Sequence, residues 1–319
     1  SILSSIGTVF IFLAPTNIFK LAISFLLGVA FSIGALAFFT CFWDLTVPEE
    51  RGRVAGLMGF VSLPIFSLIV PLAMYLDFFG RIVVSIILNL AVLAIKPLNP
   101  VKKTTLTAKG GPRGINPEKR TVLLYLIPWM ISSLINATLA RAISLHVSQY
   151  LFSSLMWLWA LQIIAGLFGA VIGGVIADFF GRKYSLVLGF TLYGISSAFS
   201  GLTKDVMMLS ITFIGTGLSW GIFLVLFLFV IWGDLADEET YYRRYSIGLA
   251  TFYFASGLGS LYTPQLLQIP LFTAAIASCL LVFLSNIPLI LAPETLPLGF
   301  REKIRLRLYI SFVKRKKPK

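Results

Sequence analysis

The sequence predicts an all-α membrane protein, and three observations support this prediction. Of the 319 residues, 58% are hydrophobic and only 12% are charged, with a mean hydropathy of +0.92. This composition is too apolar for a soluble domain of such length. The apolar residues also form long uncharged runs, and about 20 consecutive apolar residues cross a bilayer as one helix. All 13 carboxylates fall between these runs or at their ends.

The uncharged runs predict ten membrane spans. Seven of them are read directly as residues 2–14, 21–43, 54–76, 82–95, 121–140, 184–203 and 206–233. Another span is expected at about 151–177, after a short loop around His146. The uncharged run 245–293 is too long for one crossing at about 1.5 Å per residue. Pro264 and Pro270 therefore divide it into two spans.

The positive charges predict the orientation of these spans. If the spans alternate in direction, one side of the membrane holds 22 of the 26 Lys and Arg residues. The other side holds only Lys20, Arg81, Arg141 and Lys204. Lys and Arg accumulate in short cytoplasmic loops, so both ends of this chain are expected to be cytoplasmic in a multi-pass protein of the cell membrane. The same asymmetry explains the net charge of +13 without a nucleic-acid partner.

One short loop carries most of the charge between two long apolar runs. Residues 174–183 read Gly-Val-Ile-Ala-Asp-Phe-Phe-Gly-Arg-Lys. Gly181 suits a chain reversal that needs a permissive backbone. The run before the loop has glycines at positions 166, 169, 173 and 174, a spacing that lets a neighbouring helix approach the backbone closely.

This loop resembles the signature loop of the major facilitator superfamily (MFS). The matching residues are Gly174, Ala177, Asp178, Gly181, Arg182 and Lys183. Phe179 stands where the family usually has a cation. The resemblance implies an MFS-type fold of two six-helix bundles. It also implies that Asp178 and Arg182 hold the cytoplasmic side closed, with Asp178 facing the N-terminus of a helix near Arg53.

Two further turns resemble each other. The first turn, residues 43–53, is similar to the acidic, Arg-rich turn between the fourth and fifth helices of that family, and it contains Asp44, Glu49, Arg51 and Arg53. The second turn, residues 232–244, repeats the pattern with Asp234, Glu238, Arg243 and Arg244. An internal repeat of this length indicates two similar bundles. In the first turn, Thr46 and Glu49 predict a capping box for the span that follows.

The repeat predicts how the chain is divided. We expect a partial N-terminal bundle of four helices at 1–96, a cytoplasmic linker at 97–120, a six-helix C-terminal bundle at 121–293 and a basic cytoplasmic tail at 294–319. Asp44 and Asp234 are 190 residues apart, so a partner of Asp178 at that offset would precede Ser1. The chain is therefore expected to be a fragment that contains helices 3–12 of twelve. The alternative is a natural ten-helix protein.

The resemblance implies a secondary transporter that moves a small solute by alternating access between the two bundles. Its expected partners are a small-molecule substrate and the lipid bilayer, and the chain is expected to be a monomer. The alternative is a transport-inactive MFS-like membrane sensor or scaffold with the same fold. By the resemblance, the candidate residues of the substrate cavity are Asn136, Thr216, Ser219 and Trp220, with Ser32 and Thr40 opposite them.

The sequence offers little for an enzyme. His146 is the one histidine, and neither Cys41 nor Cys279 has metal-ligand spacing. No Asp or Glu lies in the middle of a predicted span, so the spans lack both a catalytic acid and a proton carrier. We therefore expect no catalytic residue, no metal and no cofactor.

Overall fold

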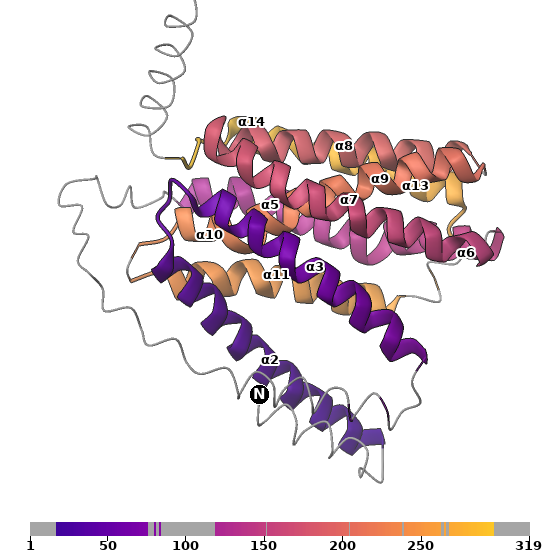
Figure 1. The fold of residues 1–319 in the computed structure, drawn as a ribbon, viewed down its shortest axis with the longest axis horizontal. Coiled ribbons are helices and arrows are strands. Elements are labelled where there is room, and N and C mark those ends of the chain that lie inside the picture. The colour runs from indigo at the N-terminus through magenta and orange to yellow at the C-terminus, as the bar shows by residue number, and fades with distance from the viewer. Residues whose placement is uncertain are drawn as a thin grey trace, which may run out of the picture. The chain divides into compact units, whose positions relative to one another are not determined.

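The computed structural model describes residues 17–75, 80, 83, 119–150, 152–203, 205–237, 239–262, 265 and 268–296. These residues form helices and no β-strand (Figure 1). The elements are α2 (Asn17–Leu45), α3 (Arg51–Tyr75), α5 (Lys119–Ile135), η1 (Asn136–Ala140), α6 (Arg141–Tyr150), α7 (Phe152–Phe179), α8 (Arg182–Leu202), α9 (Val206–Phe223), η2 (Leu224–Val230), α10 (Ile231–Asp234), α11 (Tyr241–Leu261), α13 (Leu271–Leu284) and α14 (Asn286–Leu291). The predicted span 2–14, nearly all of the span 82–95 and of the linker, and the tail beyond residue 296 lie outside the described residues.

Several of the helices are long and apolar enough to cross a membrane. Within the described residues there are five, at Lys119–Gln149, Met156–Phe179, Arg182–Leu202, Val206–Asp234 and Leu271–Leu291. They coincide with five of the ten predicted spans, and α2, α3 and α11 are long helices over three more. The described part of the chain is therefore all-α, with the apolar helices of a multi-pass membrane protein.

The segment around His146 differs from the prediction. The expected loop is wrong, because α5 continues through the π-helical turn η1 into α6 and ends only at Tyr150. Packing against the rest of the unit explains why residues 141–150 are helical. Ala142 is fully buried, and Nε2 of His146 lies 2.7 Å from the carbonyl oxygen of Ile269. Polar residues at 146 and 149 therefore sit on a helix whose apolar face is packed.

The division of the last uncharged run is confirmed. Helix α11 ends at Leu261 and α13 begins at Leu271, so the prolines at 264 and 270 both fall between the two helices. Proline has no backbone N–H to donate and disfavours helix in the residue before it, which explains the break.

The chain divides into two compact units. One contains residues 1–41 and 65–115, and the other contains residues 42–64 and 116–319. In the first unit, the described glycines Gly28 and Gly34 have open space where a Cβ would stand. The second unit holds the first turn together with the described residues after 116, and the sites below lie within it. The boundary expected at residue 96 stays a prediction.

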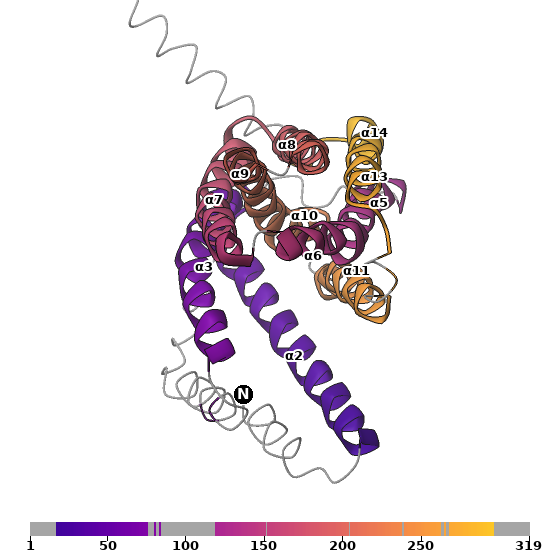
Figure 2. The same cartoon turned by 90° about the vertical axis from the view of Figure 1, so that its right-hand side faces the viewer.

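Helices α7, α8, α9 and α13 form much of the second unit (Figure 2). The glycines of α7 allow close packing: a Cβ on Gly169 would lie 2.2 Å from the carbonyl oxygen of Leu218 on α9. On the next part of α7, a Cβ on Gly174 would lie 2.2 Å from the carbonyl oxygen of Gly52 at the start of α3. The close approach that the glycine spacing predicts is therefore confirmed, and it brings α3 against the signature loop.

Candidate functional site

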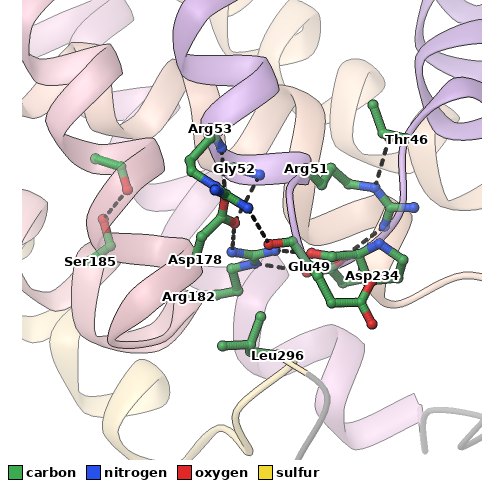
Figure 3. A network of polar contacts seen from close by, with 12 residues as sticks. Thr46, Glu49, Arg51, Gly52, Arg53, Asp178, Arg182, Ser185, Asp234 and Leu296 are labelled. Carbon is green, nitrogen blue, oxygen red and sulfur yellow. Dashed lines mark hydrogen bonds and ion pairs between the residues drawn. The ribbon is translucent and has the colours of Figure 1, made fainter. Parts of the chain in front are cut away.

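The carboxylate of Asp178, at the end of α7, binds the N-terminus of α3 (Figure 3). Its oxygens accept hydrogen bonds from the backbone N–H of Gly52 at 3.0 Å and of Arg53 at 2.7 Å. The first N–H groups of a helix have no partner within the helix, and a negative charge there is favoured by the helix dipole. The carboxylate thus caps α3, a helix from a distant part of the sequence.

Two arginines also bind Asp178. The Nε atom of Arg53 donates to Oδ2 at 3.1 Å, and Nη1 of Arg182 donates to Oδ1. The guanidinium of Arg53 lies over the ring of Phe179, 5.6 Å from its centroid. Arg53 therefore places a cation beside both Asp178 and Phe179.

The guanidinium of Arg182 joins the signature loop to both turns. Its Nε atom donates to Oδ2 of Asp234 in the second turn at 3.1 Å, and its Nη2 atom donates to the carbonyl oxygen of Pro48 in the first turn. Nη1 of Arg51 donates to the other oxygen of Asp234 at 2.5 Å, and Nε of Arg51 donates to Oγ1 of Thr46 at 3.3 Å. We call Arg51, Arg53, Asp178, Arg182 and Asp234 the ion network.

Four members of the ion network are buried. The side chains of Arg51, Asp178, Arg182 and Asp234 are exposed by 3%, 1%, 0% and 1%, and only Arg53 is substantially exposed at 46%. The buried members carry two positive and two negative charges, so the buried part is electrically balanced. Burial of ions costs several kcal/mol per ion unless each has partners of good geometry. Removal of any one of the four should therefore be costly.

Glu294 and Lys183 bind the start of α8 to the segment at residues 290–294. The carboxylate of Glu294 accepts from the backbone N–H of Arg182 at 2.8 Å and of Lys183 at 3.3 Å, so it binds the N-terminus of α8. The Nζ atom of Lys183 donates to the carbonyl oxygens of Ile290 and Ala292. Gly181 has φ of 123°, a conformation that suits glycine, and a Cβ there would lie 2.3 Å from Oε2 of Glu294.

Sequence reasoning assigned no role to Glu294. The available signal was the Pro-Glu-Thr run at 293–295, which resembles the family's common exit from its last helix and lies between the last apolar run and the basic tail. Nothing in that signal indicates which helix it binds.

The two turns also contact each other. Nε1 of Trp43 donates to the carbonyl oxygen of Gly233 at 3.0 Å, and its ring stacks on Tyr241 with the centroids 4.7 Å apart. The structure therefore brings together the loop and turn residues Gly174, Asp178, Gly181, Arg182, Lys183, Arg51, Arg53 and Asp234.

Other residues of the turns lie apart from the ion network. Asp44 and Arg243 are exposed, and Glu49 contributes only its carbonyl oxygen, 3.5 Å from Nη2 of Arg53. Arg244 is half-buried, and among the described residues its Nε atom has no hydrogen-bond partner. Glu238 lies outside the described residues.

The capping box expected in the first turn is wrong. Oγ1 of Thr46 donates to the carbonyl oxygen of Phe42 at 2.7 Å and accepts from Arg51, so it does not cap α3. The cap comes from Asp178 instead, because α3 starts only at Arg51 and its first N–H groups face the end of α7.

Two of the substrate-cavity candidates line one cavity. Asn136 and Thr216 both border a cavity of about 180 Å³ in the second unit. Ser219 is fully buried and donates to the carbonyl oxygen of Gly215, while Trp220 packs edge-on against Tyr193. Neither of them borders this cavity.

The remaining two candidates lie on the part of α2 that belongs to the first unit. There, Ser32 donates to the carbonyl oxygen of Gly28 and Thr40 donates to that of Ala37.

No family model matches the chain, and no curated protein matches it. The resemblance to the major facilitator superfamily therefore rests on the residue patterns of this chain alone.

Proposed function

We propose that this chain belongs to a secondary transporter of the major facilitator type, which moves a small solute by alternating access between two helical bundles. The observation that carries the proposal is the ion network. The sequence resemblance selects the signature loop and the first turn, and the internal repeat selects the second turn. Side chains from all three meet in one buried cluster. The proposal includes ten spans and places both ends of this chain on the cytoplasmic side.

The contacts support a gating role for this cluster. Asp178 binds the first turn of α3, and Arg182 binds both Asp178 and Asp234, so a movement of α3 away from α7 breaks several bonds at once. Each broken ionic contact exposes charge to water, and hydration offsets much of the lost attraction. A balanced, buried cluster of this kind therefore suits a contact that opens and closes during transport.

The first test measures flux. Vesicles that contain the purified 319-residue chain are loaded with a broad panel of small solutes, and exchange of each labelled solute is followed. Substrate-dependent flux by at least one solute supports the proposal. An absence of flux across the panel, from protein that is folded and inserted, favours a transport-inactive sensor or scaffold.

The second test concerns Asp178. Asp178→Asn keeps the size of the side chain but removes the charge that α3, Arg53 and Arg182 bind, so we expect a change of about tenfold or more in transport rate. In a background with Cys41 and Cys279 replaced by Ser, Val54→Cys should react faster with an impermeant maleimide when Asp178→Asn is added.

Asp205→Asn is the matched control. The Asp205 carboxylate also caps a helix, since its Oδ2 accepts from the N–H of Met208 at 3.1 Å, but it is exposed and lies outside the ion network. It should leave both measurements unchanged. Unaltered transport and labelling in Asp178→Asn would remove the gating role.

A further inference from the structure

The cavity that Asn136 and Thr216 border lies at the opposite end of α8 from the ion network. Helix α8 begins at Arg182, whereas Ser196, Ser197 and Ser200, which line the cavity, stand in its last two turns. The other lining residues are Asn136, Ala140, Arg141, Ile143, Ser144, Gln162, Tyr193, Thr212, Phe213 and Thr216. At about 180 Å³ the cavity is smaller than a drug-sized site of roughly 300–1,000 Å³, so it fits a small molecule.

One buried polar group in the lining has no acceptor. The side chain of Tyr193 is only 1% exposed, and its hydroxyl makes no hydrogen bond of good geometry with any described residue. Its polar neighbour is Trp220, whose ring centroid lies 6.3 Å away and whose indole N–H can only donate. The hydroxyl proton of Tyr193 therefore has no acceptor, and buried polar groups left in this state are rare in native proteins.

The rest of the lining offers more donors than the protein uses. The amides of Asn136 and Gln162 make no hydrogen bond with another described residue, and the guanidinium of Arg141 pairs with no carboxylate among the described residues. No Asp or Glu is among the described residues that line the cavity. The site thus has one positive charge, several free N–H groups and an unpartnered O–H, which together favour a ligand that is negatively charged and rich in acceptors.

Some hydroxyls of the lining are already committed. Ser200 donates to the carbonyl oxygen of Ser197, Thr212 to that of Met208 and Thr216 to that of Thr212. The lining donors without a partner among the described residues are therefore the two amides, Arg141, Tyr193 and the hydroxyls of Ser144, Ser196 and Ser197. Asn136 also begins η1, a π-helical turn inside a continuous helix, and such turns occur frequently at functional sites.

The remaining wall is apolar. Ala140, Ile143 and Phe213 line the cavity, and the last two are exposed by only 8% and 7%. An apolar wall provides no ligands for a hydrated inorganic ion but accepts the carbon atoms of an organic one. We infer that this cavity binds a small carboxylate anion, with its carboxylate toward the free donors and its carbon atoms against the apolar wall. The inference does not rest on transport, because binding is measured without flux.

The test is isothermal titration of the purified 319-residue chain in detergent with sodium propionate, propionamide and sodium chloride. Propionate has five heavy atoms, and a dissociation constant on the order of 1 mM is expected for it. Propionamide has nearly the same shape without the charge, so it should bind at least about tenfold more weakly. Equal binding of the acid and the amide, binding of chloride alone, or no binding at all overturns the inference.

Two variants assign the binding to this cavity. Arg141→Gln and Tyr193→Phe should each weaken propionate binding by about tenfold, since each removes a donor to the charged ligand. Tyr193→Phe keeps the ring that packs on Trp220 and Phe223, so the chain should fold normally.

The controls lie outside the cavity lining, one on α5 and one in the first turn of α8. Arg120→Gln on α5 and Tyr184→Phe on α8 alter exposed side chains and should leave the affinity within about twofold. Propionate binding that survives both Arg141→Gln and Tyr193→Phe would place the ligand elsewhere and overturn the inference.

Discussion

The first turn and the second turn have similar sequences, but their polar groups are satisfied differently. The helix after the first turn, α3, receives its cap from Asp178, which is 126 residues from Gly52 in the sequence. The loop before α11 is stabilised locally, because Oδ1 of Asp237 accepts from the N–H of Glu239 and from the N–H and hydroxyl of Thr240. The start of α3 is therefore capped by a residue from a distant part of the sequence, whereas the loop before α11 is capped by a residue of its own turn.

The two related aspartates differ in the opposite sense. Asp44 is exposed, whereas the side chain of Asp234 is 1% exposed and binds both Arg51 and Arg182. Similar sequence thus leads to a solvent-facing carboxylate in one turn and to an ion-network member in the other. Sequence repeats predict similar local structure, but the contacts of a side chain depend on which helices pack beside it.

The largest effect is expected from Arg182→Ala, which removes the cation that binds Asp178 and both turns. Asp178 and Asp234 would stay buried with fewer cations, and breaking a buried ion pair costs about 3–5 kcal/mol. Unfolding in mixed detergent micelles measures the loss. Arg120→Ala changes an exposed arginine and should cost under about 0.5 kcal/mol. Similar stabilities for the two variants would show that the ion network contributes little.

A comparison of Asp234→Asn with Asp44→Asn tests the difference between the related aspartates. Asp234→Asn weakens charged hydrogen bonds to two arginines, so a loss of about 1.5–3 kcal/mol is expected. Asp44→Asn alters an exposed side chain and should stay within about 0.5 kcal/mol of the parent. The same unfolding measurement applies, and equal losses would mean that the two turns are equivalent after all.

The close approach of α3 to α7 is tested by Gly174→Ala. The added methyl group would lie 2.2 Å from the carbonyl oxygen of Gly52, so the helices must separate, at a cost of about 1–3 kcal/mol. Gly257→Ala on α11 is the control, since no atom lies within 4 Å of a Cβ there. A stable Gly174→Ala variant with α3 still docked would contradict the packing described here.

The smallest effect concerns the local cap of the second turn. The hydroxyl of Thr240 and nearby N–H groups donate to Asp237 and lower the pKa of this carboxyl below its ordinary value. Asp237 therefore adds stability above its unfolded pKa, and this stability is lost as pH falls through the lower folded pKa. Thr240→Val should raise the pKa of Asp237 and weaken this dependence.

The measurement is stability against pH below about 4, where Asp residues titrate. Thr46→Val is the counterpart in the first turn: Oγ1 of Thr46 bonds Phe42 and Arg51 but no carboxylate, so its acid dependence should match that of the parent. An unchanged acid dependence in Thr240→Val would show that the hydroxyl does not hold the pKa down.

The sequence by itself determined the all-α membrane character and the glycine contacts of α7. The uncharged runs are longer than the apolar segments of a soluble protein core. Glycines at helical spacing let the backbone of an adjacent helix approach α7 closely. Local chemistry also determined the reversal at Gly181 and the break between α11 and α13, because both follow from the backbone preferences of single residues.

Only the tertiary structure decided which polar groups are partners. Thr46 and Glu49 match a capping box, yet the N–H groups of α3 bind Asp178, and Glu294 binds the start of α8. The helical continuation past Ala140 and the unpartnered hydroxyl of Tyr193 also depend on neighbours far away in the sequence. A local pattern states what a side chain is able to bind, whereas packing of distant helices decides what lies within 3 Å of it.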